Sequence, residues 1–134
     1  MGLRFLALLL LAAVGTTACE DTATTTPTTI TTPTTQNFSD TIGVNQGKTY
    51  QFSSTARGTV TATLTSLAPD TAVIGVSLGT WNGASCQVIL VNDQATQGAA
   101  VTGTVSAVGN LCLRVYDSGK LTEPASYSVT VSHP

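Results

Sequence analysis

Few side chains of this chain could carry out acid–base or nucleophilic chemistry. His133 is the only histidine, and it stands next to the last residue of the sequence, where we expect the backbone to fray. A Ser–His–Asp hydrolase needs a histidine that is held in place beside its nucleophile, and a frayed residue does not meet that requirement. We therefore predict no catalytic residues and expect that the protein is not an enzyme.

Oxygen ligands are the main metal chemistry that the sequence offers. Asp70, Asp93 and Asp117 each stand at the end of an expected strand, and Asn92 adjoins Asp93. Carboxylates from loops at one end of a β-domain can bind calcium through oxygen. Asp and Asn also favour turns because they hydrogen-bond to their own backbone. We favour the turn role, keep calcium as the alternative, and predict no other metal or cofactor.

Trp81, the only tryptophan, is the strongest candidate for a ligand contact. It stands with Asn82 in a polar, glycine-containing segment that runs from Gly79 to Cys86. An exposed indole could stack on a sugar ring while its polar edge and Asn82 hydrogen-bond to hydroxyl groups. The simpler interpretation is that Trp81 covers one end of the hydrophobic core. Both interpretations remain open from the sequence.

The N-terminal residues have the order of an export signal. Arg4 provides a positive charge, Phe5–Val14 is apolar, and small residues precede Cys19. The apolar run is shorter than the roughly 20 residues that a membrane-spanning helix needs. The segment Thr16-Thr17-Ala18-Cys19 resembles the lipobox of bacterial lipoproteins, with Thr16 where the family usually has Leu.

The lipobox resemblance implies cleavage before Cys19 and attachment of a palmitate-containing lipid anchor to that residue. Several acyl chains, at about 0.8 kcal/mol per buried methylene, would anchor the chain to a membrane. Glu20 follows the cysteine, which weakly favours the outer membrane or cell surface of the bacterial cell envelope as its location. The alternative is ordinary secretion after cleavage behind Ala18.

The chain has three cysteines, an odd number for an exported protein. If Cys19 carries lipid, Cys86 and Cys112 remain as a pair, and an oxidising compartment permits a disulfide between them. The alternative is two free thiols. A disulfide pair and a single histidine would leave too few ligands for a zinc site.

Composition divides the chain into three segments and limits its partners. We expect residues 1–18 to be a signal peptide, residues 19–36 a threonine- and proline-rich tether, and residues 37–134 a folded domain. Charged residues are 9% of the chain and the net charge is −2. Because nucleic-acid binding needs clustered Lys and Arg, we predict no nucleic-acid partner.

Residues 59–65 show the clearest secondary-structure signal, because Val60, Ala62 and Leu64 alternate strictly with threonines. This period of two predicts a strand with one buried face. Other segments repeat it: Tyr50 and Phe52; Ile74, Val76 and Leu78; Leu111, Leu113 and Val115; Tyr127, Val129 and Val131. We therefore predict an all-β fold, a single antiparallel β-sandwich of seven or eight strands with jelly-roll or immunoglobulin-like size.

Two strands carry additional expectations. The continuous apolar run Val88–Val91 is typical of a central strand. If Leu111 and Leu113 face the core, Cys112 and Arg114 face outward, since an unpaired charge is rarely buried. The predicted disulfide would then hold the Cys86 loop against the outer face of a strand rather than cross the core.

The domain resembles the bacterial pre-peptidase C-terminal domain, a β-sandwich often appended to secreted proteases. The matching segments are Gly47 with Tyr50 and Phe52, then residues 58–64, 109–117 and 126–131. The resemblance implies the sandwich fold, export and a binding role, without an activity of its own.

Together these features predict a non-catalytic lipoprotein of the bacterial cell envelope. Its partners would be the membrane, through the lipid on Cys19, and a carbohydrate or protein surface at the domain. The alternative is a structural or accessory subunit of an envelope or secreted complex.

Overall fold

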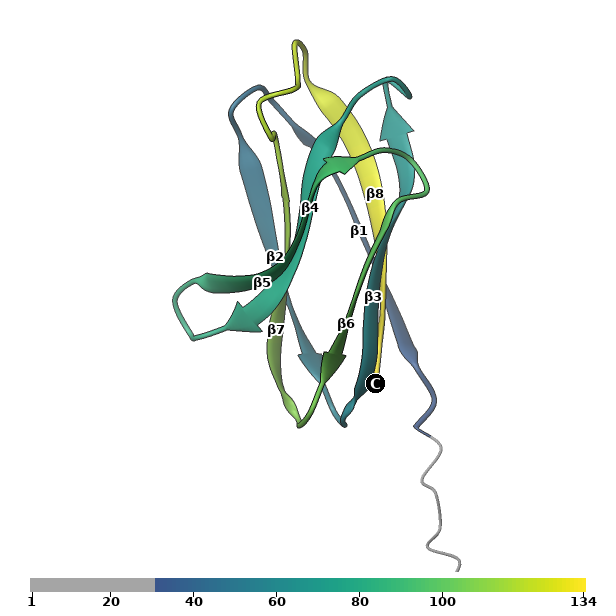
Figure 1. Cartoon of the computed structure of the whole chain (residues 1–134), viewed down its shortest axis with the longest axis vertical. Coiled ribbons are helices and arrows are strands. Elements are labelled where there is room, and N and C mark those ends of the chain that lie inside the picture. Colours follow the sequence, from purple (N-terminus) through teal and green to yellow (C-terminus); the bar gives the residue numbers. More distant parts are fainter. Residues whose placement is uncertain (1–30) are drawn as a thin grey trace, which may run out of the picture.

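The computed structural model describes residues 31–134, which form an all-β sandwich (Figure 1). The predicted signal peptide, Cys19 and most of the predicted tether lie outside the described residues. Eight strands make up the fold: β1 (Thr34–Ile42), β2 (Gly47–Ser54), β3 (Gly58–Ala68), β4 (Ile74–Trp81), β5 (Cys86–Ala95), β6 (Ala100–Val105), β7 (Gly109–Tyr116) and β8 (Ala125–His133). The predicted sandwich is confirmed.

The strands form two four-stranded antiparallel sheets that face each other. One sheet has the order β1-β8-β3-β6 and the other has the order β2-β7-β4-β5. The edge strand β1 contacts the edge strand β2 on one side of the sandwich, whereas β5 contacts β6 on the opposite side. These two sides differ in how they are closed.

The core consists of side chains that alternate along the central strands, as the period of two predicts. In β3, Ala62 and Leu64 are fully buried, and they lie opposite Val131 and Val129 of β8. Residues that lie opposite each other in antiparallel strands share a face, so both strands contribute to one continuous core. Within residues 31–134 no helix is long and apolar enough to span a membrane.

The expectation that Val88–Val91 forms a central strand is wrong, because β5 is an edge strand. In the described part of the chain β5 pairs with β4 alone. Val88, Ile89 and Val91 are 41%, 67% and 52% exposed. A bulge adds Ile89 between the pairs that Leu90 and Val88 make with β4. The run is apolar, but only its Leu90 side chain packs against the core.

The expectation that His133 lies in a frayed terminus is also wrong. β8 lies between β1 and β3, and His133 pairs with Thr34 of β1. The His133 side chain is 3% exposed, and its ring lies 5.1 Å from that of Phe52. A central strand has a neighbour on each side, which explains why its last residues are held in place.

Candidate functional site

A disulfide joins Cys86 of β5 to Cys112 of β7, as predicted, with 5.7 Å between the two Cα atoms. Cys112 is fully buried but lies outside the core cluster that contains its neighbours Leu111 and Leu113. It therefore faces outward, and the end of the β4–β5 hairpin covers it. Because β4 lies between β5 and β7, the disulfide passes over the outer face of β4.

Small residues on the outer face of β4 make room for this crossing. A Cβ atom on Gly79 would lie 2.1 Å from the backbone oxygen of Gln87, and one on Gly75 would lie 2.3 Å from the Tyr116 ring. The Tyr116 hydroxyl donates a hydrogen bond to Asp93 of β5. Tyr116 thus crosses β4 at Gly75 as the disulfide crosses it at Gly79. Burial and the neighbouring Asp93 raise the pKa of Tyr116 to about 12.

Trp81 and Asn82 lie together at the tip of the β4–β5 hairpin. Trp81 pairs with Cys86, is half-buried and does not belong to the core cluster. The Asn82 side-chain oxygen accepts hydrogen bonds from the backbone N–H groups of Ala84 and Ser85, at 2.9 and 2.8 Å. Part of the indole therefore remains accessible, while the Asn82 oxygen is engaged in forming the turn.

The Asp117 carboxylate connects the β7–β8 loop to the β1–β2 loop by hydrogen bonds. Its Oδ1 accepts hydrogen bonds from three consecutive backbone N–H groups, those of residues 119, 120 and 121, at 2.8–3.1 Å. Its Oδ2 accepts one from the Asn45 N–H at 2.8 Å. The Asn45 and Leu121 amides are the main reason that the pKa of Asp117 lies below its ordinary value. Oδ1 thus serves the turn role, whereas Oδ2 connects this turn to the β1–β2 loop.

The other calcium candidates, Asn92, Asp93 and Asp70, each have different surroundings. Asn92 accepts a hydrogen bond from the Gln94 N–H at 3.0 Å, and Asp93 accepts from Tyr116. Asp70 is exposed in the turn between β3 and β4. Over residues 31–134 the structure has no group of three or more His, Cys, Asp or Glu side chains that could hold a metal ion.

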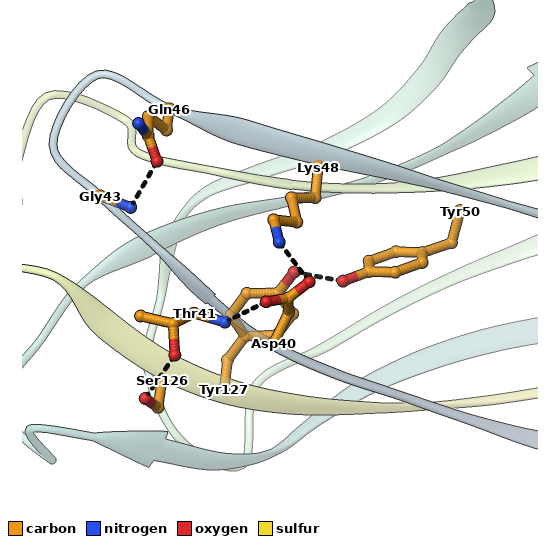
Figure 2. A network of polar contacts seen from close by, with 8 residues as sticks. All are labelled: Asp40, Thr41, Gly43, Gln46, Lys48, Tyr50, Ser126 and Tyr127. Atoms are coloured by element: carbon orange, nitrogen blue, oxygen red, sulfur yellow. Dashed lines mark hydrogen bonds and ion pairs between the residues drawn. The ribbon is translucent and has the colours of Figure 1, made fainter.

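Polar and aromatic contacts close the β1–β2 side of the sandwich (Figure 2). Asp40 of β1 forms an ion pair with Lys48 of β2, and the Lys48 ammonium is the main cause that lowers the pKa of Asp40. The hydroxyls of Tyr50 and Tyr127 share a hydrogen bond of 2.6 Å, and the Phe38 ring stacks on Tyr50 at 4.8 Å. These contacts join the two sheets along this side.

The opposite side, between β5 and β6, contains an open apolar cavity of about 320 Å³. We call it the edge groove. Apolar side chains dominate its lining: Phe52, Val60, Leu78, Ile89, Leu90, Val105, Val108 and Leu111. None of the described residues that line it carries a charge. Ile89 and Val108, at 67% and 71% exposure, leave apolar surface at its mouth.

The edge groove does not follow from the sequence pattern. Val88–Val91 has the pattern of a central strand, and Val108 stands in a turn that no periodicity marks. Gly103 of β6 also contributes, because a Cβ atom there would lie 2.4 Å from Cδ1 of Leu90. An apolar residue beside a turn glycine, as in Val108-Gly109, is a weak sequence signal that could have suggested it.

The chain also contains a Gly-x-Ser-x-Gly pattern that the prediction of no catalytic residues left out: Gly75-Val76-Ser77-Leu78-Gly79. In hydrolases this pattern forms a sharp turn from a strand into a helix, which exposes the serine. Here it lies within β4. Ser77 is 1% exposed, and its hydroxyl has no hydrogen-bond partner among residues 31–134. The His133 Nδ1 contacts the Pro134 backbone oxygen at 3.1 Å. The close packing over β4 accounts for both glycines of the pattern, because a Cβ atom would meet the Tyr116 ring at Gly75 and the Gln87 backbone at Gly79.

Comparison with known proteins adds no relative: no protein-family model matches the chain, and no curated protein matches it. The sandwich architecture is therefore what the structure shows of the resemblance to the pre-peptidase C-terminal domain.

Proposed function

We propose that this chain is a non-catalytic binding module of the bacterial cell envelope, and that the edge groove binds an apolar segment of another envelope protein. The observation that supports this most directly is the uncharged lining of the groove together with its exposed rim, Ile89 and Val108. Apolar surface that is exposed around a groove is typical of an interaction site.

The chemistry of the groove favours a protein segment over a polar metabolite. A volume of about 320 Å³ is large enough for a few apolar side chains. A polar ligand would need hydrogen-bond donors and acceptors that converge inside the cavity, since a buried polar group without partners is costly. The lining offers mainly apolar groups, so hydrophobic burial would supply most of the binding free energy.

The tether would present this site from the membrane. Under this proposal Cys19 carries the lipid, and the rest of the tether links it to the sandwich, whose first strand begins at Thr34. This agrees with the resemblance to lipoproteins and to the pre-peptidase C-terminal domain. Radiolabelled palmitate should be incorporated into the wild-type chain and not into the Cys19→Ser variant. Absence of label in the wild type would refute the anchor.

Site-specific photocrosslinking in intact cells tests the binding site. A photoreactive amino acid at position 108 of the full chain should capture one envelope protein, whereas the same group at position 44 should not. Val44 is the matched control because it is also an exposed valine, at 43%, and stands in the β1–β2 loop, whereas position 108 stands in the β6–β7 loop. Ile89→Asp should reduce capture from position 108 by about tenfold or more, equivalent to about 1.4 kcal/mol.

Equal capture from positions 108 and 44 would refute the groove as the binding site. Recovery of the captured protein in a fixed one-to-one ratio would instead favour the accessory-subunit alternative. The Cys19→Ser variant, which should be mislocalised, reports whether capture depends on display at the membrane.

A second candidate function is glycan binding at the hairpin tip, which the half-buried indole of Trp81 favours. Trp81→Ala should keep the fold but lose retention on envelope glycans, whereas Trp81→Phe should keep part of it because an aromatic face remains. Unchanged retention in both variants would exclude this role. Turnover of any substrate by the purified protein, lost on substitution of His133, would overturn the non-catalytic proposal.

A further inference from the structure

Strand β5 differs from the other edge strands in its lack of protection against pairing. Edge strands commonly carry charges or are kept short, which discourages another strand from adding to them. β1 and β2 carry the Asp40–Lys48 ion pair, and β6 is six residues long. β5 is ten residues long, and residues 87–92 contain no charge.

The sequence of this segment is symmetric in residue type. From the centre between Ile89 and Leu90, the chain has two aliphatic residues and then an amide in each direction. These are Ile89, Val88 and Gln87 on one side, and Leu90, Val91 and Asn92 on the other. An antiparallel pair of two such segments, related by a two-fold axis between Ile89 and Leu90, would place Val88 opposite Val91. It would also place Ile89 opposite Leu90, and Gln87 opposite Asn92.

The bulge at Ile89 places the residues that would pair with each other on the same face of the sheet. Val88 lies opposite Gly79 and Val91 lies opposite Ser77, and both of these β4 residues face outward. Ile89 and Leu90 both line the edge groove on the inner side. In a regular strand, residues three apart point to opposite faces. The extra residue at the bulge places Val88 and Val91 on the same face, as the two-fold pairing requires.

The charges also suit this register. Asp93 is the only charged residue of β5, and the two-fold axis places it opposite Cys86 rather than opposite Asp93 of the second copy. Asp93 already accepts the hydrogen bond from the Tyr116 hydroxyl. Pairing therefore brings no like charges together, and the exposed Val88 and Val91 become covered.

The geometry points to a second copy of this chain as the partner of β5, through antiparallel β5–β5 pairing about an axis between Ile89 and Leu90. The β2-β7-β4-β5 sheets of the two copies then join into one sheet. The edge grooves of the two copies come to lie side by side beneath the paired β5 strands. A bulge often protects an edge strand by twisting it. Here the bulge at Ile89 instead places Val88 and Val91 on the same face, so that they can pair across the two copies. This inference does not depend on a partner protein in the groove.

Cysteine crosslinking of full-length chains in the bacterial envelope tests the register. Two differently tagged versions are co-expressed, one with Val88→Cys and the other with Val91→Cys, and are then mildly oxidised. Directly opposed residues in an antiparallel pair have Cα atoms about 4.5–5.5 Å apart, which permits a disulfide. Two copies of the same variant would hold their new cysteines roughly 10 Å apart along the strands, which is too far.

The mixture should therefore give crosslinked dimers, joined at positions 88 and 91, at about tenfold or more the yield of either variant alone, because only the mixture places opposed thiols within bonding distance. A mixture of Val44→Cys with Val91→Cys is the control, because Val44 is exposed to 43% and stands between β1 and β2, at the sheet edges opposite to β6 and β5. Equal yields in the control, or in either variant alone, would overturn the proposed pairing.

Two further variants separate this inference from the proposed function. Ile89→Lys added to both tagged chains should abolish crosslinking, whereas Val44→Lys should not, because only the first places a charge in the paired strand. Val108→Asp should weaken capture of a partner protein and leave β5–β5 crosslinking unchanged, since Val108 lies outside β5. Crosslinking that fails while partner capture persists would refute the dimer alone.

Discussion

Replacement of Gly79 by alanine tests the packing over the outer face of β4. The new Cβ atom would lie 2.1 Å from the Gln87 oxygen and 2.7 Å from its carbonyl carbon. Both are backbone atoms, so no side-chain rotation can relieve the contact. The β4–β5 hairpin would have to move, and Cys86 of the disulfide with it.

The expected cost follows from overpacking. Insertion of a methyl group into a tightly packed site typically destabilises a protein by about 1–3 kcal/mol. Because the contact is with backbone, we expect the upper part of that range, offset by about 0.4–1 kcal/mol from the reduced entropy of the unfolded chain. The net loss in the free energy of unfolding is then about 2 kcal/mol. For a domain of this size this lowers Tm by roughly 8–16 °C.

Gly109→Ala is the matched control, because Gly109 also lies in a strand and an added Cβ atom meets no atom of the described residues within 4 Å. It should be neutral or stabilising by up to about 1 kcal/mol. Thermal and urea unfolding of the oxidised chain, followed by circular dichroism, measures both variants. A Gly79→Ala stability within about 0.5 kcal/mol of that of Gly109→Ala would refute the close crossing of β4.

Three further predictions concern the links between loops and strands. Replacement of Cys86 and Cys112 by serine should lower the free energy of unfolding by about 3.5 kcal/mol, from the sequence separation of 26 residues that the disulfide closes, as measured by urea unfolding. Asp117→Asn should lower Tm at neutral pH and make Tm depend less on pH in acid. The pKa of Asp117 is depressed in the folded state, so its carboxylate stabilises the fold above the ordinary pKa of 3.8. This stabilisation is lost as pH falls through the folded pKa. Tyr116→Phe should destabilise the chain by about 1 kcal/mol through loss of the bond to Asp93. It should also remove the tyrosine that titrates near pH 12 in near-ultraviolet absorbance; because that folded pKa is raised, the stabilisation is complete below pH 10 and is lost as pH rises through about 12. An unchanged Tm in any of these variants would contradict the corresponding contact.

The features that the sequence predicted are those that depend on a period of two. Alternation along Val60–Leu64 and Tyr127–Val131 identifies buried faces without knowledge of which strands are neighbours, and both segments lie in the core. The same alternation placed Cys112 on an outer face, where the disulfide is found. Local pattern was sufficient for these features because a strand determines the faces of its own side chains.

Features that depend on the order of strands in the sheets were not predictable in this way. An apolar run such as Val88–Val91 fits a central strand, and only the order β2-β7-β4-β5 shows that it lies at an edge. The edge groove needs both that order and the short β6 of the facing sheet. His133 was misjudged for a related reason, since its burial comes from the pairing of β8 with a strand at the other end of the described chain.

The two links over β4 connect the fold to both proposals. An edge strand that is held only by its backbone bonds to one neighbour is free to open, and such a strand presents a poorly defined surface. β5 is instead joined to β7 at two positions, by the Cys86–Cys112 disulfide and by the Asp93–Tyr116 hydrogen bond. These positions lie on either side of Val88–Val91, so the apolar segment is supported at both ends. A supported edge costs less conformational entropy when a partner binds, which favours β5 and the adjoining edge groove as the interaction surface of this protein.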